Sequence, residues 1–230
     1  MKKKIIFVLL LAVIIVKAQN MSVFLRANAS GWYPYFLEPV VSEVLQTPNA
    51  MHVLDIGTGL GKLPELLYKA DSSLIVKGID IDTAYIDHAK KHIQNTHVSF
   101  DYQQINAPLA FQDASFDVVT FCSVLFLLDE PTKQLLMQEA IRVLKPNGKL
   151  IVLTPLGKKS PLSAWIEVWK YPFSQHNWTF IIWKTLTTKR GKEWQKKEWL
   201  QKYAQQHGLS YTIRRVFNEN ATLEILIKKS

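Results

Sequence analysis

The feature that most constrains the fold is a largely apolar run that breaks into three glycines at alternate positions. Residues 53–56 form the run, Gly57, Gly59 and Gly61 follow it, and a segment with helical periodicity begins directly afterwards. Glycine adopts positive φ angles and lacks the Cβ atom that would keep a ligand away from the backbone. The unpaired N–H groups at the start of a helix also favour ligand oxygens. The pattern therefore predicts a strand, a ligand-binding loop and a helix.

A second apolar run ends in an acidic residue. Residues 74–79 lead into Asp80, which would lie at the tip of the strand next to the glycine loop. A carboxylate at this place accepts hydrogen bonds from the two hydroxyl groups of a ribose. Together the two features indicate a cofactor that contains a nucleoside.

The spacing of the glycines narrows the choice of cofactor. A dinucleotide fingerprint requires Gly-x-Gly-x-x-Gly, but Lys62 stands where the last glycine is needed. A phosphate-binding loop would require glycine at position 56 and Ser or Thr at position 63, where the chain has Ile56 and Leu63. The sequence therefore favours neither of these classes of nucleotide-binding protein.

Four motifs in order resemble those of the class I S-adenosylmethionine-dependent methyltransferases, and most closely their small-molecule, type 11-like branch. Residues 55–61 are similar to the first motif of that family and 78–82 to the second. Residues 111–119 resemble the strand-four signature, and 140–150 resemble the helix and turn before strand five. The resemblance implies S-adenosyl-L-methionine as the cofactor and methyl transfer by in-line displacement as the reaction. A non-catalytic protein that binds this cofactor, or a regulatory one, is the alternative.

The resemblance also implies a set of cofactor-binding residues at the carboxyl ends of the strands. The set is Asp55, Gly57, Thr58, Gly59, Gly61, Asp80, Ile81, Asn106, Ala107 and Ser123. No metal ligand and no catalytic residue is assigned from the sequence.

The chain departs from the family pattern at two places. Relatives carry aspartate where this chain has Asn106, whose carbonyl can still accept a hydrogen bond from the adenine amino group. Many relatives carry histidine in the segment that matches 124–128, where this chain has Phe126. If the acceptor must lose a proton, the candidates for a base are Tyr33, Tyr35 and His176. The alternatives are packing of the N-terminal cap for the two tyrosines and an exposed loop for the histidine.

Apolar runs alternate with helical segments along the chain. Strands are expected at 52–56, 74–79, 98–103, 117–122 and 149–154, and helices at 63–69, 83–94 and 131–144. A helix near 193–207 and a hairpin of 210–217 with 221–228 follow. This order predicts a doubly wound, Rossmann-like α/β fold: a mostly parallel seven-stranded sheet with a terminal antiparallel hairpin and an aromatic-rich cap.

The expected regions are a hydrophobic leader, an N-terminal cap helix region, the cofactor-binding core, an aromatic and basic insertion, and a last helix with the terminal hairpin. Their limits are 1–20, 21–49, 50–155, 156–190 and 191–230. The only cysteine, Cys122, excludes an internal disulfide and is expected to be a buried small residue.

Six of the seven tryptophans follow the last parallel strand, interleaved with Lys and Arg in a chain of net charge +9. Ser160-Pro161 predicts a helix start, with Trp165 and Trp169 one turn apart. One interpretation is a pocket for a small, hydrophobic or lipid-like acceptor, or a lid that contacts a membrane. The other is an aromatic cap packed on its own sheet. Nucleic acid is not favoured as a partner because no recognised nucleic-acid module is present, and no oligomeric state is predicted.

The first residues have the layout of a secretory signal. Three lysines precede the twelve apolar residues 5–16, and Ala18 follows. As a helix, that run would span about 18 Å, too short for the roughly 30 Å hydrocarbon core. An export signal conflicts with a cofactor that is kept in the cytosol. Three explanations stay open: export, an uncleaved membrane tether, or a true start at Met21. A cytoplasmic catalytic domain, with or without membrane attachment, agrees best with the cofactor.

Overall fold

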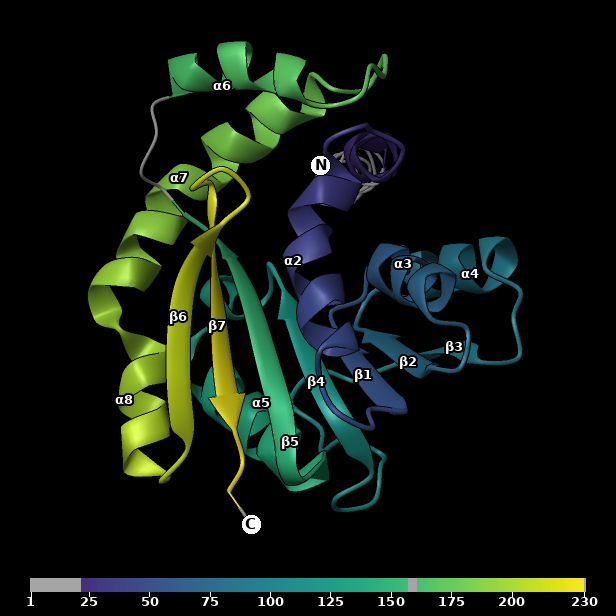
Figure 1. The fold of residues 1–230 in the computed structure, drawn as a ribbon, viewed down its shortest axis with the longest axis vertical. Helices are drawn as coiled ribbons and strands as arrows, with labels where there is room; N and C mark the ends of the chain where they lie inside the picture. The colour runs from purple at the N-terminus through teal and green to yellow at the C-terminus, as the bar shows by residue number, and fades with distance from the viewer. Residues whose placement is uncertain (1–21, 157–160, 230) are drawn as a thin grey trace, which may run out of the picture.

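A seven-stranded sheet forms the centre of the computed structural model, which describes residues 22–156 and 161–229 (Figure 1). The expectations about the leader, Met21 and Ser160 therefore lie outside the described residues. The strand order is β3-β2-β1-β4-β5-β7-β6. The strands are β1 His52–Ile56, β2 Ile75–Asp80, β3 Val98–Tyr102, β4 Phe116–Cys122, β5 Leu144–Pro155, β6 Ser210–Val216 and β7 Ala221–Ile227.

Five strands run parallel, and the C-terminal hairpin completes the sheet. β7 pairs antiparallel with both β5 and β6, so the hairpin lies along the β5 edge. The helices are α2 Tyr33–Leu45, α3 Lys62–Ala70, α4 Thr83–His92, α5 Glu130–Val143, α6 Pro161–Glu167, α7 Thr179–Lys197 and α8 Trp199–Gln206. Two short 3-10 helices, η1 Leu125–Leu127 and η2 Val168–Lys170, follow β4 and α6. The predicted mostly parallel sheet with a terminal hairpin is confirmed.

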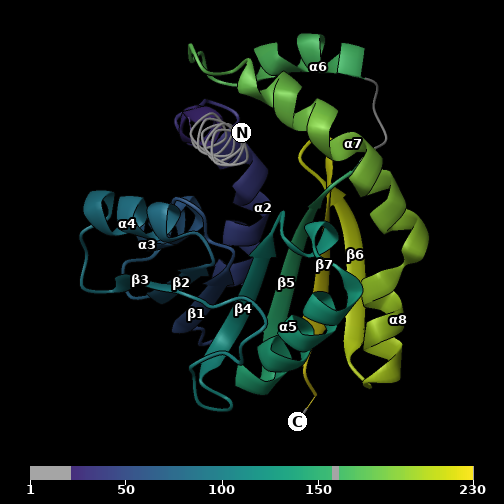
Figure 2. The same cartoon turned by 180° about the vertical axis from the view of Figure 1, so that it is seen from behind.

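Alternation of apolar side chains along the strands produces two cores. Val53 and Ile151 pack on one face of the sheet with α2 and α3, whereas their neighbours Leu54 and Val152 pack on the other face with α5 and α8. Figures 1 and 2 show these two helical layers from opposite sides. Because a strand places successive side chains on opposite faces, β1, β4 and β5 each supply both cores, whereas Val98 and Phe100 of β3 pack with α4 in a smaller third cluster.

The polypeptide between β5 and β6 differs from the prediction. The single helix expected near 193–207 is two helices, which meet at Glu198 with a φ of 50°. α7 already begins at Thr179, so the expected boundary at residue 190 falls inside this helix. A positive φ at a non-glycine residue interrupts regular helix geometry, which explains the break.

An aromatic cluster joins the N-terminal segment, α7 and the C-terminal hairpin. Its members are Trp32, Tyr33, Phe36, Tyr171, Phe180, Trp183 and Phe217. Trp32 is fully buried, and its indole N–H donates a hydrogen bond to the Thr179 hydroxyl at 2.9 Å. The predicted aromatic-rich cap is therefore present. No helix within the described residues has the length and apolar character needed to cross a bilayer.

Candidate functional site

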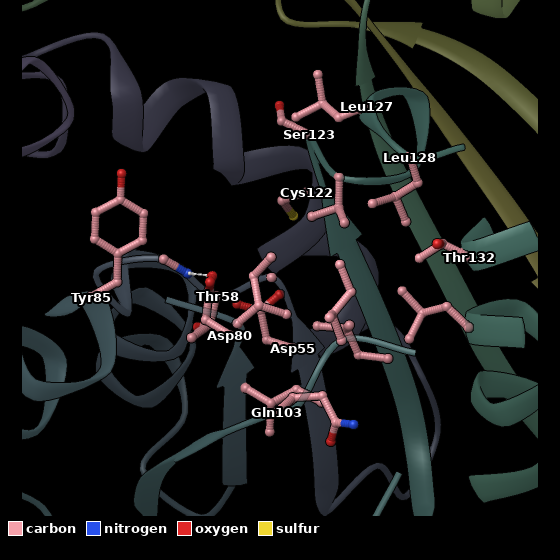
Figure 3. Close-up of a pocket in the computed structure, with 18 of the residues that line it drawn as sticks. Asp55, Thr58, Asp80, Tyr85, Gln103, Cys122, Ser123, Leu127, Leu128 and Thr132 are labelled. Carbon is pink, nitrogen blue, oxygen red and sulfur yellow. Dashed lines mark hydrogen bonds between the residues drawn. The ribbon is translucent and has the colours of Figure 1, made fainter. Parts of the chain in front are cut away.

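A cavity of about 450 Å³ lies beyond the carboxyl ends of β1, β2 and β4 (Figure 3). At this place the strand order reverses: β2 and β3 lie on one side of β1, and β4 and β5 lie on the other. Open α/β sheets bind their ligands at such a point. Nine of the ten residues predicted from the sequence line the cavity: Asp55, Gly57, Thr58, Gly59, Asp80, Ile81, Asn106, Ala107 and Ser123.

Two glycines of the loop are required by its geometry. Gly57 has a φ of +75°, and a Cβ atom there would lie 2.3 Å from Val124 Cγ2. Gly59 has a φ of +56°, and a Cβ atom there would lie 2.7 Å from the Phe24 ring. The absence of both side chains brings bare backbone to the cavity wall, as a cofactor held against the loop requires.

Gly61 has a different role from the one predicted. It is the N-cap residue of α3 with a φ of +79°, but it is not among the residues that line the cavity. A Cβ atom on Gly61 would lie 2.7 Å from the Phe100 ring of β3. This glycine therefore allows α3 to pack closely on the sheet.

Asp80 is held in one orientation at the tip of β2. Its Oδ2 atom accepts the Gly59 N–H at 2.8 Å, and its Oδ1 atom accepts the Asp82 N–H at 3.0 Å. Burial raises the pKa of Asp80, although these backbone hydrogen bonds oppose the rise. Each carboxylate oxygen can accept a further hydrogen bond, so the two hydroxyl groups of a ribose fit this side chain.

Asp55 is a buried carboxylate at the end of β1. Its Oδ1 atom accepts the Thr120 hydroxyl at 2.7 Å, and burial raises its pKa to about 6. Among the described residues it forms no ion pair, and a buried carboxylate is stabilised by a cationic partner. A ligand that carries an ammonium or sulfonium charge would provide one.

Asn106 and Ser123 supply further polar atoms to the cavity wall. Asn106 has a φ of 59°, and its side-chain oxygen accepts the Thr132 hydroxyl at 2.9 Å, which leaves a lone pair for an adenine amino group. The Ser123 hydroxyl is buried and has no hydrogen-bond partner among the described residues. Unpaired buried hydroxyls are costly, so Ser123 also fits a polar ligand.

Of the three candidate bases, only Tyr33 lines the cavity. Burial raises the pKa of Tyr33 far above its usual range, with the nearby Cys122 and Asp55 adding to the rise, so its hydroxyl stays protonated near neutral pH. Tyr35 is half exposed and packs beside Tyr171. His176 lies in the loop before α7, outside the cavity wall. Tyr33 is therefore a hydrogen-bond donor.

Cys122 also lines the cavity, without being a nucleophile. Burial raises the pKa of its thiol well above the usual value, which removes the reactive thiolate. Phe126, which replaces the histidine of relatives, packs into the hydrophobic core beside α5 and α8.

The apolar wall of the cavity was not identified from the sequence. Its side chains come from the N-terminal segment, η1, α5 and α7, and include Phe24, Leu37, Val124, Leu127, Leu128, Leu135, Leu136 and Trp183. Leu, Val and Phe carry no local signal that separates a cavity wall from a core. Trp183 lies in the aromatic and basic insertion that the sequence indicated, and Val124, Leu127 and Leu128 lie in the segment 124–128, which the sequence singled out only for its missing histidine.

The strand order, the glycine loop and the acidic residue at the tip of β2 define a class I S-adenosylmethionine-dependent methyltransferase. Independently, a family model described as "Methyltransferase domain" matches residues 48–206. The chain belongs to this methyltransferase family. The cofactor of the site is accordingly S-adenosyl-L-methionine.

Curated relatives are similar over part of their length. A ubiquinone biosynthesis O-methyltransferase of Coxiella burnetii is 34% identical over 109 residues, which cover 47% of this chain and 45% of that protein. A protein of the same name from Pasteurella multocida is 30% identical over 172 residues, covering 65% and 68%. The chain thus spans less than half the length of the first of these relatives.

Solved structures with low sequence identity share the fold. A SAM-dependent methyltransferase from Aquifex aeolicus superposes with a TM-score of 0.59 at 17% identity, covering 83% of this chain and 88% of that one. The plantazolicin methyltransferase in complex with SAH gives a TM-score of 0.61 at 17% identity, covering 91% and 85%. At this level of identity the likeness concerns the architecture.

Proposed function

We propose that this protein transfers the methyl group of S-adenosyl-L-methionine to a small, uncharged, hydrophobic acceptor. We also propose that the ten residues predicted from the sequence form the cofactor site, to which Gly61 contributes indirectly by letting α3 pack closely on the sheet. The observation that carries the proposal is the composition of the cavity wall. Beside the glycine loop lie Phe24, Leu37 and Trp183, which offer an apolar surface to a second ligand. Such a surface favours an acceptor that gains free energy by leaving water.

The charges in the cavity support an uncharged acceptor. Among the described residues that line it, the only charged side chains are those of Asp55 and Asp80, and no Lys, Arg or His is present. An acceptor with a carboxylate or phosphate group would meet two carboxylates and no cation. In a water-poor cavity this repulsion is poorly screened.

The reaction needs positioning more than proton transfer. When bound, S-adenosyl-L-methionine supplies a methyl carbon that its sulfonium already activates. Asp80 orients the ribose, Asp55 lies where it balances positive charge, and Trp183 and Phe24 exclude water from the acceptor side. The Tyr33 hydroxyl, which remains protonated, would donate a hydrogen bond to a ligand in the cavity. Together these residues would hold the acceptor beside the methyl carbon.

The relatives support a lipid-like acceptor. Their names refer to ubiquinone biosynthesis, and quinone precursors combine an aromatic ring with an apolar tail. We propose that the acceptor of the present chain belongs to this lipid-like class. We also propose that the catalytic domain acts on the cytoplasmic side, where its cofactor is kept, close to the membrane that holds such acceptors.

Calorimetry with the full chain tests the cofactor half of the proposal. Micromolar binding of S-adenosyl-L-methionine is expected, with a loss of tenfold or more in Asp80→Ala, since hydrogen bonds to a charged group contribute about 1.5–3 kcal/mol. Asp87→Ala, which removes an exposed carboxylate from α4, is the matched control and should bind normally. Absence of binding, or preference for NAD, would contradict the assignment.

Turnover tests the acceptor half. Formation of S-adenosylhomocysteine is measured with a panel of phenols, amines and thiols that carry apolar tails, each paired with a carboxylated analogue. We expect turnover with the uncharged member of a pair and little with the charged member. Cofactor binding without turnover on any acceptor would instead support a non-catalytic protein.

A further inference from the structure

The face of the molecule formed by α6 and η2 carries an unusual concentration of exposed apolar side chains. Trp165, Ile166, Trp169 and Phe173 are 61%, 74%, 82% and 92% exposed. We call these four residues the α6–η2 patch. Single exposed apolar residues are common on soluble proteins, but a group of large ones close together marks an interaction surface.

The patch is held outward by buried contacts on the opposite side of the same segment. Ala164 and Glu167 are buried, and the Glu167 carboxylate accepts a hydrogen bond from the buried Asn220 side chain of the hairpin turn. Because Ala164 and Glu167 face inward, Trp165 and Ile166 between them face outward. The exposure of the patch is therefore fixed by the fold.

Positive charge is concentrated in the segment that carries the patch and in the helix α7 that follows it. In the stretch from α6 to the end of α7, a single exposed acidic residue, Glu193, stands against six exposed basic ones. The basic residues are Lys170, Lys189, Arg190, Lys192, Lys196 and Lys197. This combination of tryptophan with lysine and arginine suits the headgroup region of a bilayer, where indole rings lie at the interface and cations meet anionic lipids.

The N-terminal segment enters the structure beside the patch. The helix at 22–28 places the Arg26 guanidinium 5.8 Å from the Trp178 ring centroid, and Ser174 donates a hydrogen bond to the Ala29 carbonyl at 3.3 Å. Figure 1 shows the start of the described chain at the same end of the molecule as α6. The sequence before this helix contains three lysines and then the apolar run 5–16. The described chain thus begins at the same end of the molecule as the patch.

We propose that the α6–η2 patch docks on the surface of an anionic lipid bilayer. The rings of Trp165, Trp169 and Phe173 would lie among the headgroups, Lys170 would contact anionic lipids, and the cations further along α7 would add to the attraction. A bilayer accounts for both the aromatic residues and the excess of positive charge, whereas a second copy of this chain would bring like charges together. The surface is separate from the cavity, so the proposal stands or falls without the methyl-transfer reaction.

A probe at the most exposed position tests the docking directly. Phe173→Cys in the full chain is labelled with a polarity-sensitive fluorophore, because the native thiol, Cys122, is only partly exposed and has a raised pKa. Phosphatidylcholine vesicles that contain phosphatidylglycerol should shift its emission to the blue. The same label at Met51→Cys, a half-exposed position before β1, is the control and should not respond. The probe reports on the patch itself even if the N-terminal run also binds the vesicles.

A second variant measures the contribution of the patch. Ile166→Ser with Trp169→Ser should weaken partitioning of the full chain onto anionic vesicles about tenfold or more, since membrane affinity scales with buried apolar area. Tyr102→Ser, which alters an exposed aromatic residue on β3, should leave partitioning unchanged, and circular dichroism verifies each fold. Unchanged emission at position 173 would overturn the proposal, as would an equal shift with pure phosphatidylcholine. A shift that grows with protein concentration without vesicles would indicate a second copy of the chain instead.

Discussion

The Lys184 ammonium group donates a hydrogen bond of 2.5 Å to the side-chain oxygen of Asn220, and both residues are almost completely buried. The Asn220 amide in turn donates to the Glu167 carboxylate. This chain of polar contacts connects α7, the β6–β7 turn and the end of α6. A buried charge is tolerated only where such partners are in place.

Replacing Lys184 should therefore destabilise the protein strongly. Lys184→Met removes the ammonium group and leaves Asn220 and Glu167 buried without it, for which we expect a loss of about 3 kcal/mol in the free energy of unfolding. Urea denaturation measures this loss. Lys192→Met, on the exposed side of the same helix, should change stability by less than about 0.5 kcal/mol. Equal effects of the two variants would contradict the assigned role of the buried lysine.

The glycine loop permits a comparison of two alanine substitutions with similar backbone angles. Gly57 and Gly208 have φ values of +75° and +65°, but a Cβ atom meets Val124 at the first position and nothing within 4 Å at the second. Gly208→Ala should lower the free energy of unfolding by about 1 kcal/mol, because alanine is strained in the left-handed backbone conformation. Gly57→Ala should lower the free energy of unfolding by about 1–3 kcal/mol more, because the added methyl group overpacks the site. This variant should also bind S-adenosyl-L-methionine poorly. Thermal unfolding and calorimetry report the two effects.

Asp55 should make the cofactor-free protein sensitive to pH. Burial raises its pKa in the folded state to about 6 from an unfolded value of 3.8, so the folded state binds the proton more tightly. The stability that this group provides is present below about pH 4 and is lost as the pH rises to about 6, a change of about 3 kcal/mol. Asp55→Asn should therefore be more stable than the parent protein at pH 7, with a smaller difference at pH 4, and should bind the cofactor more weakly. Asp87→Asn should show neither effect.

Restoring the acidic residue of relatives should improve cofactor binding. Asn106→Asp keeps an acceptor for the Thr132 hydroxyl and offers a charged acceptor to the adenine amino group. A gain of about 1 kcal/mol corresponds to roughly fivefold tighter binding. Asn147→Asp is the matched control, because Asn147 is also exposed with a positive φ of 61° but lies before the parallel part of β5, away from the cavity. Tighter binding in both variants would indicate a general effect of charge.

The sequence was sufficient for the parts of the fold that depend on local patterns. Apolar runs located six of the seven strands to within one residue at each end, and only β5 begins five residues before the expected start. The positions of Asp80 and the glycine loop followed because parallel strands present their carboxyl ends at one edge.

Features that depend on distant contacts were missed for a physical reason. The space beside each glycine is taken by a residue distant in sequence: Val124 at Gly57, Phe24 at Gly59 and Phe100 at Gly61, and only the first two glycines line the cavity. The division of the last helix at Glu198 depends on how α7 and α8 pack on the sheet, and intrinsic propensity is too weak to reveal it. The apolar wall is likewise assembled by tertiary packing.

The hydrogen bond between Trp32 and Thr179 spans 147 positions of the chain. Phe24 and Leu37, from the first part of the chain, and Trp183, from the last third, therefore reach their places around the cavity only through contacts made late in synthesis. A ribosome-bound fragment that ends before α7 can form the β1 to β5 layer but lacks the enclosure for an acceptor, and its N-terminal aromatic residues lack their partners from α7 and the hairpin. During synthesis this segment is accordingly the exposed apolar surface that a chaperone would bind.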